Sequence, residues 1–172
     1  MKLKILTISL ATIALMLFMS QVNAQAKKKA NKATLAWRYD IECAGTGSQG
    51  FYLVKVWSYS KKPAVAIEQS KKNAVHGIVF KGFSGRSVDG CTAQRPIAPN
   101  PTIEQEHSDF FTKFFSDGGD YMKYVSHSTY MSKDVVKVGK EYKVSVVVSV
   151  SKDQLRKDLE AAGIIKGLSS GF

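Results

Sequence analysis

Residues 142–150 read Tyr-Lys-Val-Ser-Val-Val-Val-Ser-Val, and this stretch decides the fold. Apolar side chains occupy every second position, at 142, 144, 146, 148 and 150. A period of two predicts a β-strand that buries one of its faces. Ser151 follows, and Leu155 and Leu159 then recur at helical spacing, so the strand is expected to lead directly into a helix that ends near Gly163.

Three other segments have strand character. Residues 35–43 alternate between apolar and polar side chains, and residues 51–59 (FYLVKVWSY) are rich in aromatic and β-branched residues. The intervening residues 44–50 are rich in glycine, so the two segments are expected to form a hairpin. Residues 121–130 are expected to pair with residues 142–150 as a second hairpin.

Two further helices are expected between these strand pairs. Pro63 is a favourable first helical residue, and a helix from there to Phe80 would place Ile67, Ser70, Ala74 and Ile78 on one buried stripe. A second helix is expected from Thr102 to Ser116, with core phenylalanines. The predicted order is β-β-α-α-β-β-α, an α+β fold with two antiparallel strand pairs in one sheet and helices packed on one face.

The glycine-rich turn contains Gly45, Gly47 and Gly50 in the spacing G-x-G-x-x-G. That spacing binds dinucleotides where it joins a strand to a helix, because the helix N-terminus holds the pyrophosphate. Here the turn is predicted to join two strands, so no nucleotide site and no cofactor are expected.

The first 26 residues have the order of a signal peptide. Lys2 and Lys4 precede an apolar stretch from Ile5 to Met19, and Ala24 and Ala26 form an Ala-x-Ala site. An uncleaved anchor and cleavage after Ala24 are the alternatives. The chain is expected to be exported, to the periplasm, to the cell exterior or in association with the outer membrane, with no transmembrane anchor after cleavage.

The net charge of +11 is unevenly distributed along the chain. Residues 27–34 form a basic tail that we expect to be flexible, residues 35–165 form a single α+β domain, and residues 166–172 form a C-terminal tail. The domain carries 18 basic and 14 acidic side chains, a net charge of only +4. No specific nucleic-acid partner is therefore expected for the folded part.

Export affects how the two cysteines are interpreted. A bond between Cys43 and Cys91 would close a loop of about 48 residues and contribute roughly 3 to 4 kcal/mol in the chain-entropy model. The alternative is a pair of buried thiols, because the distance between the Cα atoms decides whether a bond can form.

Residues 82–101 are the least regular part of the predicted domain, with repeated glycine and proline. Long loops in compact domains are often functional or mobile. Arg86, Asp89 and Arg95 are therefore candidates for a contact surface, and a mobile connector is the alternative interpretation.

No catalytic or metal-binding residues are predicted. His76, His107 and His127 lie in different expected elements without the spacing of a zinc motif, and no G-x-S-x-G elbow is present. The acidic residues at 104, 106 and 109 match a helix N-terminus better than an acid and base pair. The sequence therefore favours a protein that is not an enzyme.

A family resemblance rests on four parts of the chain. Residues 52–56 form a strand, residues 66–75 form a helix with Ala-x-x-x-Ala-like spacing, and residues 142–148 form a strand that leads into a helix with Leu155 and Leu159. Over about residues 50–165 this order resembles the LPP20 lipoproteins and the N-terminal domains of the flagellar proteins FlgO and FlgT. The lipid-bearing cysteine of the lipoprotein members is missing here.

The resemblance implies a small α+β module of the cell envelope that binds other proteins and has no active site. We therefore expect a non-catalytic interaction module whose partners are envelope or surface proteins, or a second copy of the chain. An extracellular enzyme or small-ligand binder that uses residues 82–101 is one alternative. Polyanion binding through the basic residues 27–32 is another.

Overall fold

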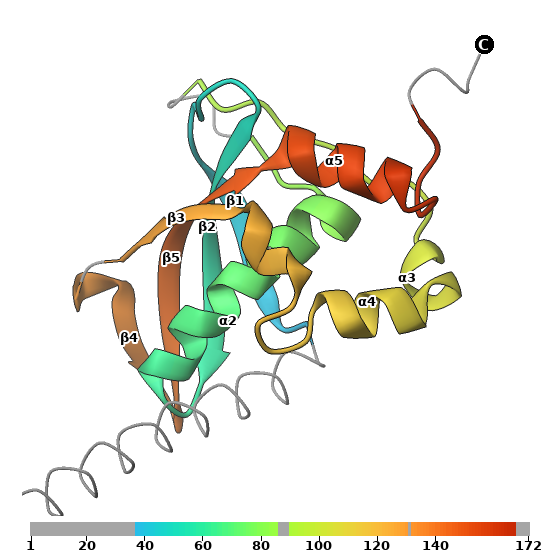
Figure 1. Ribbon diagram of the computed structural model, residues 1–172. Coiled ribbons are helices and arrows are strands. Elements are labelled where there is room, and N and C mark those ends of the chain that lie inside the picture. Colours follow the sequence, from blue (N-terminus) through green and yellow to red (C-terminus); the bar gives the residue numbers. More distant parts are fainter. Residues whose placement is uncertain (1–36, 86–89, 131, 168–172) are drawn as a thin grey trace, which may run out of the picture.

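A computed structural model describes residues 37–85, 90–130 and 132–167 (Figure 1). Their elements follow in the order β1 (Tyr39–Gly45), β2 (Phe51–Ser60), α2 (Pro63–His76), the π-helix η1 (Gly77–Lys81), α3 (Ile103–Glu106), α4 (Ser108–Phe114), the 3₁₀-helix η3 (Asp120–Tyr124), β3 (Val125–Thr129), the 3₁₀-turn η4 (Ser132–Asp134), β4 (Val135–Val138), β5 (Glu141–Ser151) and α5 (Lys152–Ala161). The α+β class predicted from the sequence is confirmed.

The strands form one antiparallel sheet in the order β1-β2-β5-β3, and β4 pairs with the other half of β5. In the centre, Val54 lies opposite Val148 and Val56 lies opposite Val146. All four valines are buried, which confirms that the alternation in residues 142–150 marks one core-facing side. β5 is thus the strand that pairs with three others, β2, β3 and β4.

Helix α2 lies across the core-facing side of β2 and β5, and α4 and α5 pack on the same side (Figure 1). Ala66, Ser70 and Ala74 are completely buried on α2, so small side chains allow the helix to approach the sheet closely. Two polar contacts fix this packing, because Ser58 Oγ accepts hydrogen bonds of 2.9 Å from Ser70 Oγ and from Asn73 Nδ2.

The helix expected over residues 63–80 changes character at its end. The α-helix stops at His76, and the chain continues as a π-helix from Gly77 to Lys81. A Cβ atom at Gly77 would lie 2.6 Å from Cδ1 of Ile41, so a side chain there would compete with β1 for space. Lys72, on the same helix, is buried at 3% exposure although its side chain is charged.

Two further expectations were wrong in detail. Residues 121–124 form η3 rather than a strand, because Tyr121 and Tyr124 are both buried at a spacing of three. The helix expected from Thr102 to Ser116 is broken at His107 into α3 and α4. The sheet also contains β4, which the sequence analysis did not identify.

A disulfide joins Cys43 on β1 to Cys91 in the irregular segment 82–102, with the Cα atoms 5.9 Å apart. It confirms the pairing that the sequence left open. The segment also pairs with η1 by backbone hydrogen bonds, from Ile97 N to Ile78 O at 3.1 Å and from Ala98 N to Val79 O at 2.9 Å.

Within the described residues no helix has the length and apolarity needed to cross a membrane.

Candidate functional site

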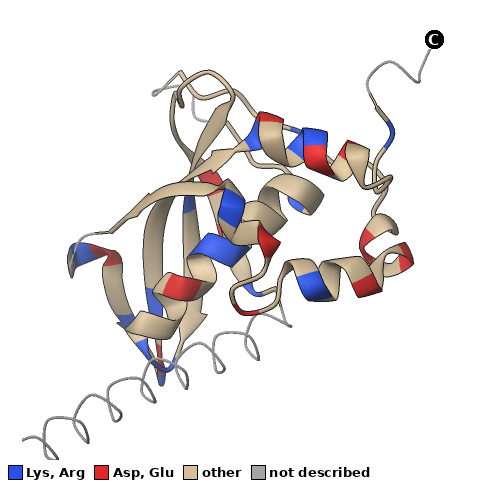
Figure 2. Ribbon diagram, viewed as in Figure 1, with Lys and Arg blue, Asp and Glu red and all other residues tan. Residues whose placement is uncertain are grey.

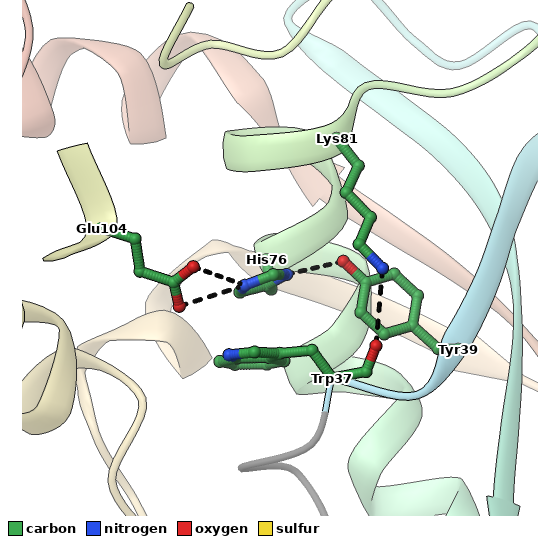
Figure 3. A network of polar contacts seen from close by, with 5 residues as sticks. All are labelled: Trp37, Tyr39, His76, Lys81 and Glu104. Carbon is green, nitrogen blue, oxygen red and sulfur yellow. Dashed lines mark hydrogen bonds and ion pairs between the residues drawn. The ribbon is translucent and has the colours of Figure 1, made fainter. Parts of the chain in front are cut away.

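His76, at the end of α2, is the centre of a polar network (Figure 3). Its imidazole is only 3% exposed. Tyr39 reaches it from β1, and Glu104 reaches it from α3. The network forms because the last turn of α2 lies between the start of β1 and the segment that carries α3.

The hydrogen bonds define the protonation state of this network. Tyr39 Oη lies 2.6 Å from Nδ1 of His76, and Nε2 lies 3.2 Å from Oε1 of Glu104. Burial, and secondarily Glu104, raises the pKa of Tyr39, so its hydroxyl is protonated and donates to Nδ1. The hydrogen bond from His76 lowers the pKa of Glu104, so an ionised carboxylate accepts from Nε2–H.

A neutral imidazole satisfies both bonds. Burial lowers the pKa of His76, although the hydrogen bond and the charge of Glu104 act in the opposite direction. Neutral His76 therefore accepts at Nδ1 and donates at Nε2, which leaves neither ring nitrogen unsatisfied.

Trp37 and Lys81 close the network on its remaining sides. The Trp37 ring stacks on His76 with centroids 3.5 Å apart and an interplanar angle of 19°. Lys81 Nζ donates to the carbonyl oxygen of Trp37 at 3.4 Å and lies 3.8 Å from the centroid of the Tyr39 ring. Trp37 has a positive φ of 42°, which is unfavourable for a tryptophan and which these contacts hold in place.

The carboxylate of Glu104, the imidazole of His76 and the hydroxyl of Tyr39 are hydrogen-bonded in a row, as acid, histidine and hydroxyl are in the catalytic triads of hydrolases. A triad hydroxyl also donates to its histidine, but Tyr39 differs because it is only 7% exposed and burial raises its pKa. A nucleophilic oxygen must be reached by a substrate as well as activated by its base. The arrangement is therefore suited to joining β1, α2 and α3 rather than to catalysis.

A cleft of about 680 Å³ lies on the other side of α3. Ile97, Ile103, Ile164 and Ile165 contribute apolar lining. Arg156 and Lys166 contribute positive charge, and Glu106 contributes a carboxylate. The end of the irregular segment and the residues after α5 form opposite walls. The cleft combines an apolar surface with a few charged groups, as small-ligand sites do.

The candidate contact residues of the irregular segment are not brought together. Arg86 and Asp89 lie outside the described residues, Arg95 is exposed, and Cys91 is in the disulfide. The far end of the same segment, with Pro96 and Asn100, lines the cleft together with His107. No group of three or more potential metal ligands was found among the described residues.

The face of the sheet opposite α2, which none of the described helices covers and which we call the uncovered face, carries a third group of side chains. Lys55 Nζ and Lys143 Nζ lie 4.5 Å and 4.7 Å from the centroid of the Trp57 ring. The guanidinium carbon of Arg38 lies 4.6 Å from the centroid of Tyr59. Because side chains alternate along a strand, this group points away from α2.

No known protein family, curated protein or solved structure matches this chain.

Sequence reasoning missed the network because each member had a sufficient local explanation. Tyr39 fitted the alternation of a strand, and Glu104 fitted the first turn of a helix. His76 was the available signal, since a histidine near the end of a buried helix needs polar partners. Their positions, 37 residues apart for Tyr39 and His76 and 28 apart for His76 and Glu104, leave no local pattern.

Proposed function

We propose that this protein is an exported, non-catalytic interaction module whose partners are proteins of the cell envelope or cell surface. It acts in the periplasm or outside the cell. The observation that carries the proposal is the uncovered face of the sheet, where Trp57 and Tyr59 lie among basic side chains.

The Cys43–Cys91 disulfide supports the compartment. Disulfides persist in oxidising compartments and are rare where thiols are kept reduced. The bond joins β1 to the irregular segment, so an oxidising environment, which preserves the bond, stabilises the fold. The closed network around His76 supports a role without catalysis, since its hydroxyl is buried and protonated.

The residue types on the uncovered face support protein binding. Tryptophan, tyrosine and arginine are the types that most often dominate the binding energy of protein interfaces. Here Trp57 and Tyr59 are on β2, and Arg38 directly precedes the neighbouring strand β1, which the sheet holds in register with β2. Acidic side chains at 40 and 42 lie on the same face, so the surface presents both charges and favours a complementary protein over a simple polyanion.

Crosslinking in cells that express the full chain tests this proposal. The double variant Trp57→Ala/Tyr59→Ala should lose a crosslinked partner that the unchanged chain captures. Met122→Ala is the matched control, because Met122 is 41% exposed on η3, away from this face. Capture that is absent, or unchanged by the double variant, would overturn the proposal, and capture of a second copy would identify the partner as the chain itself.

The cleft beside α3 favours a second function, the binding of a small amphiphilic anion. Its isoleucines suit an apolar chain, and Lys166 suits a carboxylate, together with Arg156, whose Nε is already paired with Glu160 over 2.9 Å. Glu106 also lines the cleft, so the carboxylate would bind on the side of Lys166 and Arg156. Decanoate should then raise the thermal unfolding temperature, and Asn100→Trp, which places a large ring in the cleft, should abolish that rise. An equal rise in both proteins would exclude the cleft as the binding site.

A further inference from the structure

Two turns that are far apart in the chain, the β2–α2 turn and the β4–β5 turn, lie at the same end of the sheet. β4 and β5 are joined by a tight turn at Gly139 and Lys140, where Gly139 adopts a φ of 60°. Ser60, the last residue of β2, lies opposite Tyr142 on β5. The turn from β2 into α2 therefore lies beside the β4–β5 turn, at the end of the sheet shown lowest in Figure 1.

Both turns are basic (Figure 2). Four exposed lysines lie on or next to them, namely Lys61, Lys62, Lys137 and Lys140. None of the four forms an ion pair with a carboxylate in the part of the chain that the structure describes. Glu141 is adjacent to them, but its carboxylate is held 2.6 Å from Arg38. We call these four lysines the basic end.

Exposed apolar side chains accompany this charge. Val136 and Val138 on β4 are 48% and 52% exposed, and both stand on the same side of the strand. Lysines on an edge strand discourage pairing with other chains, which would account for Lys137. The same argument does not account for two exposed valines, because apolar residues on an edge strand increase the risk of aggregation.

We propose that the basic end, together with Val136 and Val138, binds an anionic lipid surface. Lysines attract negatively charged headgroups, and the two valines enter the boundary between headgroups and acyl chains. Nucleic acid and other soluble polyanions would use the lysines and leave the valines in water. The valines therefore favour a membrane surface. Val136 lies opposite Lys143, and Lys143 lies opposite Tyr59, so the two valines adjoin the proposed interaction face on the same side of the sheet. The inference itself needs no protein partner.

Vesicle sedimentation tests the proposal with protein purified from expression of the full chain. The vesicles contain phosphatidylcholine alone or phosphatidylcholine with about one third phosphatidylglycerol. The unchanged protein should bind the anionic vesicles and bind the neutral ones weakly. The variant Lys61→Gln/Lys62→Gln/Lys137→Gln/Lys140→Gln should lose about fivefold in partition coefficient for each lysine removed.

A matched charge control separates the site from the total charge. Four exposed basic side chains elsewhere are changed to glutamine in this control, Arg95, Lys113, Lys123 and Lys157. All variants retain residues 27–32, so any binding by that basic tail is common to them. A loss in the control as large as the loss in the basic-end variant would overturn the proposal.

The valines provide the second test. Val136→Ser/Val138→Ser should weaken vesicle binding severalfold and leave retention on heparin unchanged, because heparin offers charge without an apolar layer. Vesicle binding that the serine variant retains in full would indicate a polyanion site and would overturn the lipid proposal. Circular dichroism of each variant checks that the sheet is intact.

Discussion

Tyr39 on β1 donates its hydroxyl hydrogen to Nδ1 of His76 over 2.6 Å, although the two residues are 37 positions apart. The bond fixes the neutral tautomer that also donates to Glu104. Both ring nitrogens are therefore satisfied in a buried position, where an unsatisfied polar group would be costly.

Tyr39→Phe should reduce the free energy of unfolding by about 1–3 kcal/mol, because Nδ1 of His76 then loses its buried donor. Urea unfolding followed by circular dichroism measures the change. Tyr59→Phe is the matched control, since the Tyr59 hydroxyl makes only an exposed bond of 3.3 Å to Asp40. Equal losses in the two variants would contradict a special role for the Tyr39 bond.

The stability should fall on acidification, and His76 should account for the first part of the loss. Burial lowers the pKa of His76 below its ordinary value of 6.5, so the unfolded chain binds the proton more readily than the folded chain. The contribution of neutral His76 to the free energy of unfolding is fully present above pH 6.5. It is lost as the pH falls through the lowered pKa that His76 has in the folded protein. The lowered pKa of Glu104 adds a second loss below pH 4.5.

Unfolding free energies measured from pH 8 to pH 5 test this assignment. The slope should be smaller in His76→Gln than in the unchanged protein, while His107 and His127 remain in both. Parallel slopes would show that another group controls this pH range.

Cys43→Ser/Cys91→Ser should reduce the free energy of unfolding by roughly 3–4 kcal/mol, because the bond closes a long loop in the unfolded chain. Reductant should destabilise the unchanged protein and leave the double variant unaffected. Intact mass before and after reduction verifies that the bond is present, and a gain of two hydrogens is the expected difference.

Gly82→Ala should destabilise the fold by about 1–3 kcal/mol through the backbone alone, because φ 68° with ψ −167° is a conformation essentially restricted to glycine, and a steric clash should add to this loss. Gly82 has a φ of 68°, and a Cβ atom there would lie 2.3 Å from the backbone oxygen of Gln94. Gly118→Ala separates the two effects, because Gly118 has a φ of 69° but nothing within 4 Å of an added Cβ. The control should lose only about 1–2 kcal/mol, the cost of the left-handed conformation, and thermal unfolding measures both.

Much of the sheet and of α2 was predictable because an element that buries one side has apolar or small residues at regular spacing in its sequence. The valines of β5 alternate, and Ala66, Ser70 and Ala74 recur along the helix face that contacts it. The 3₁₀-helix η3 was mistaken for a strand because Tyr121 and Tyr124 are aromatic residues that also favour strands. Strand β4 is only four residues long, too short for its alternation to be distinctive.

The α+β class, the central strand, the candidate cysteine pair and most of the buried stripe of α2 follow from the sequence alone, although Ile67 in that stripe is only half-buried. Each depends on residue type and spacing within one segment, where a single buried face imposes a period of two or of three to four. Three further features depend on how the elements pack together: the bond between Cys43 and Cys91, the meeting of Tyr39 and Glu104 at His76, and the two basic turns at one end of the sheet. These contacts join residues from separate elements, and their distances follow from the order of the strands rather than from any local pattern.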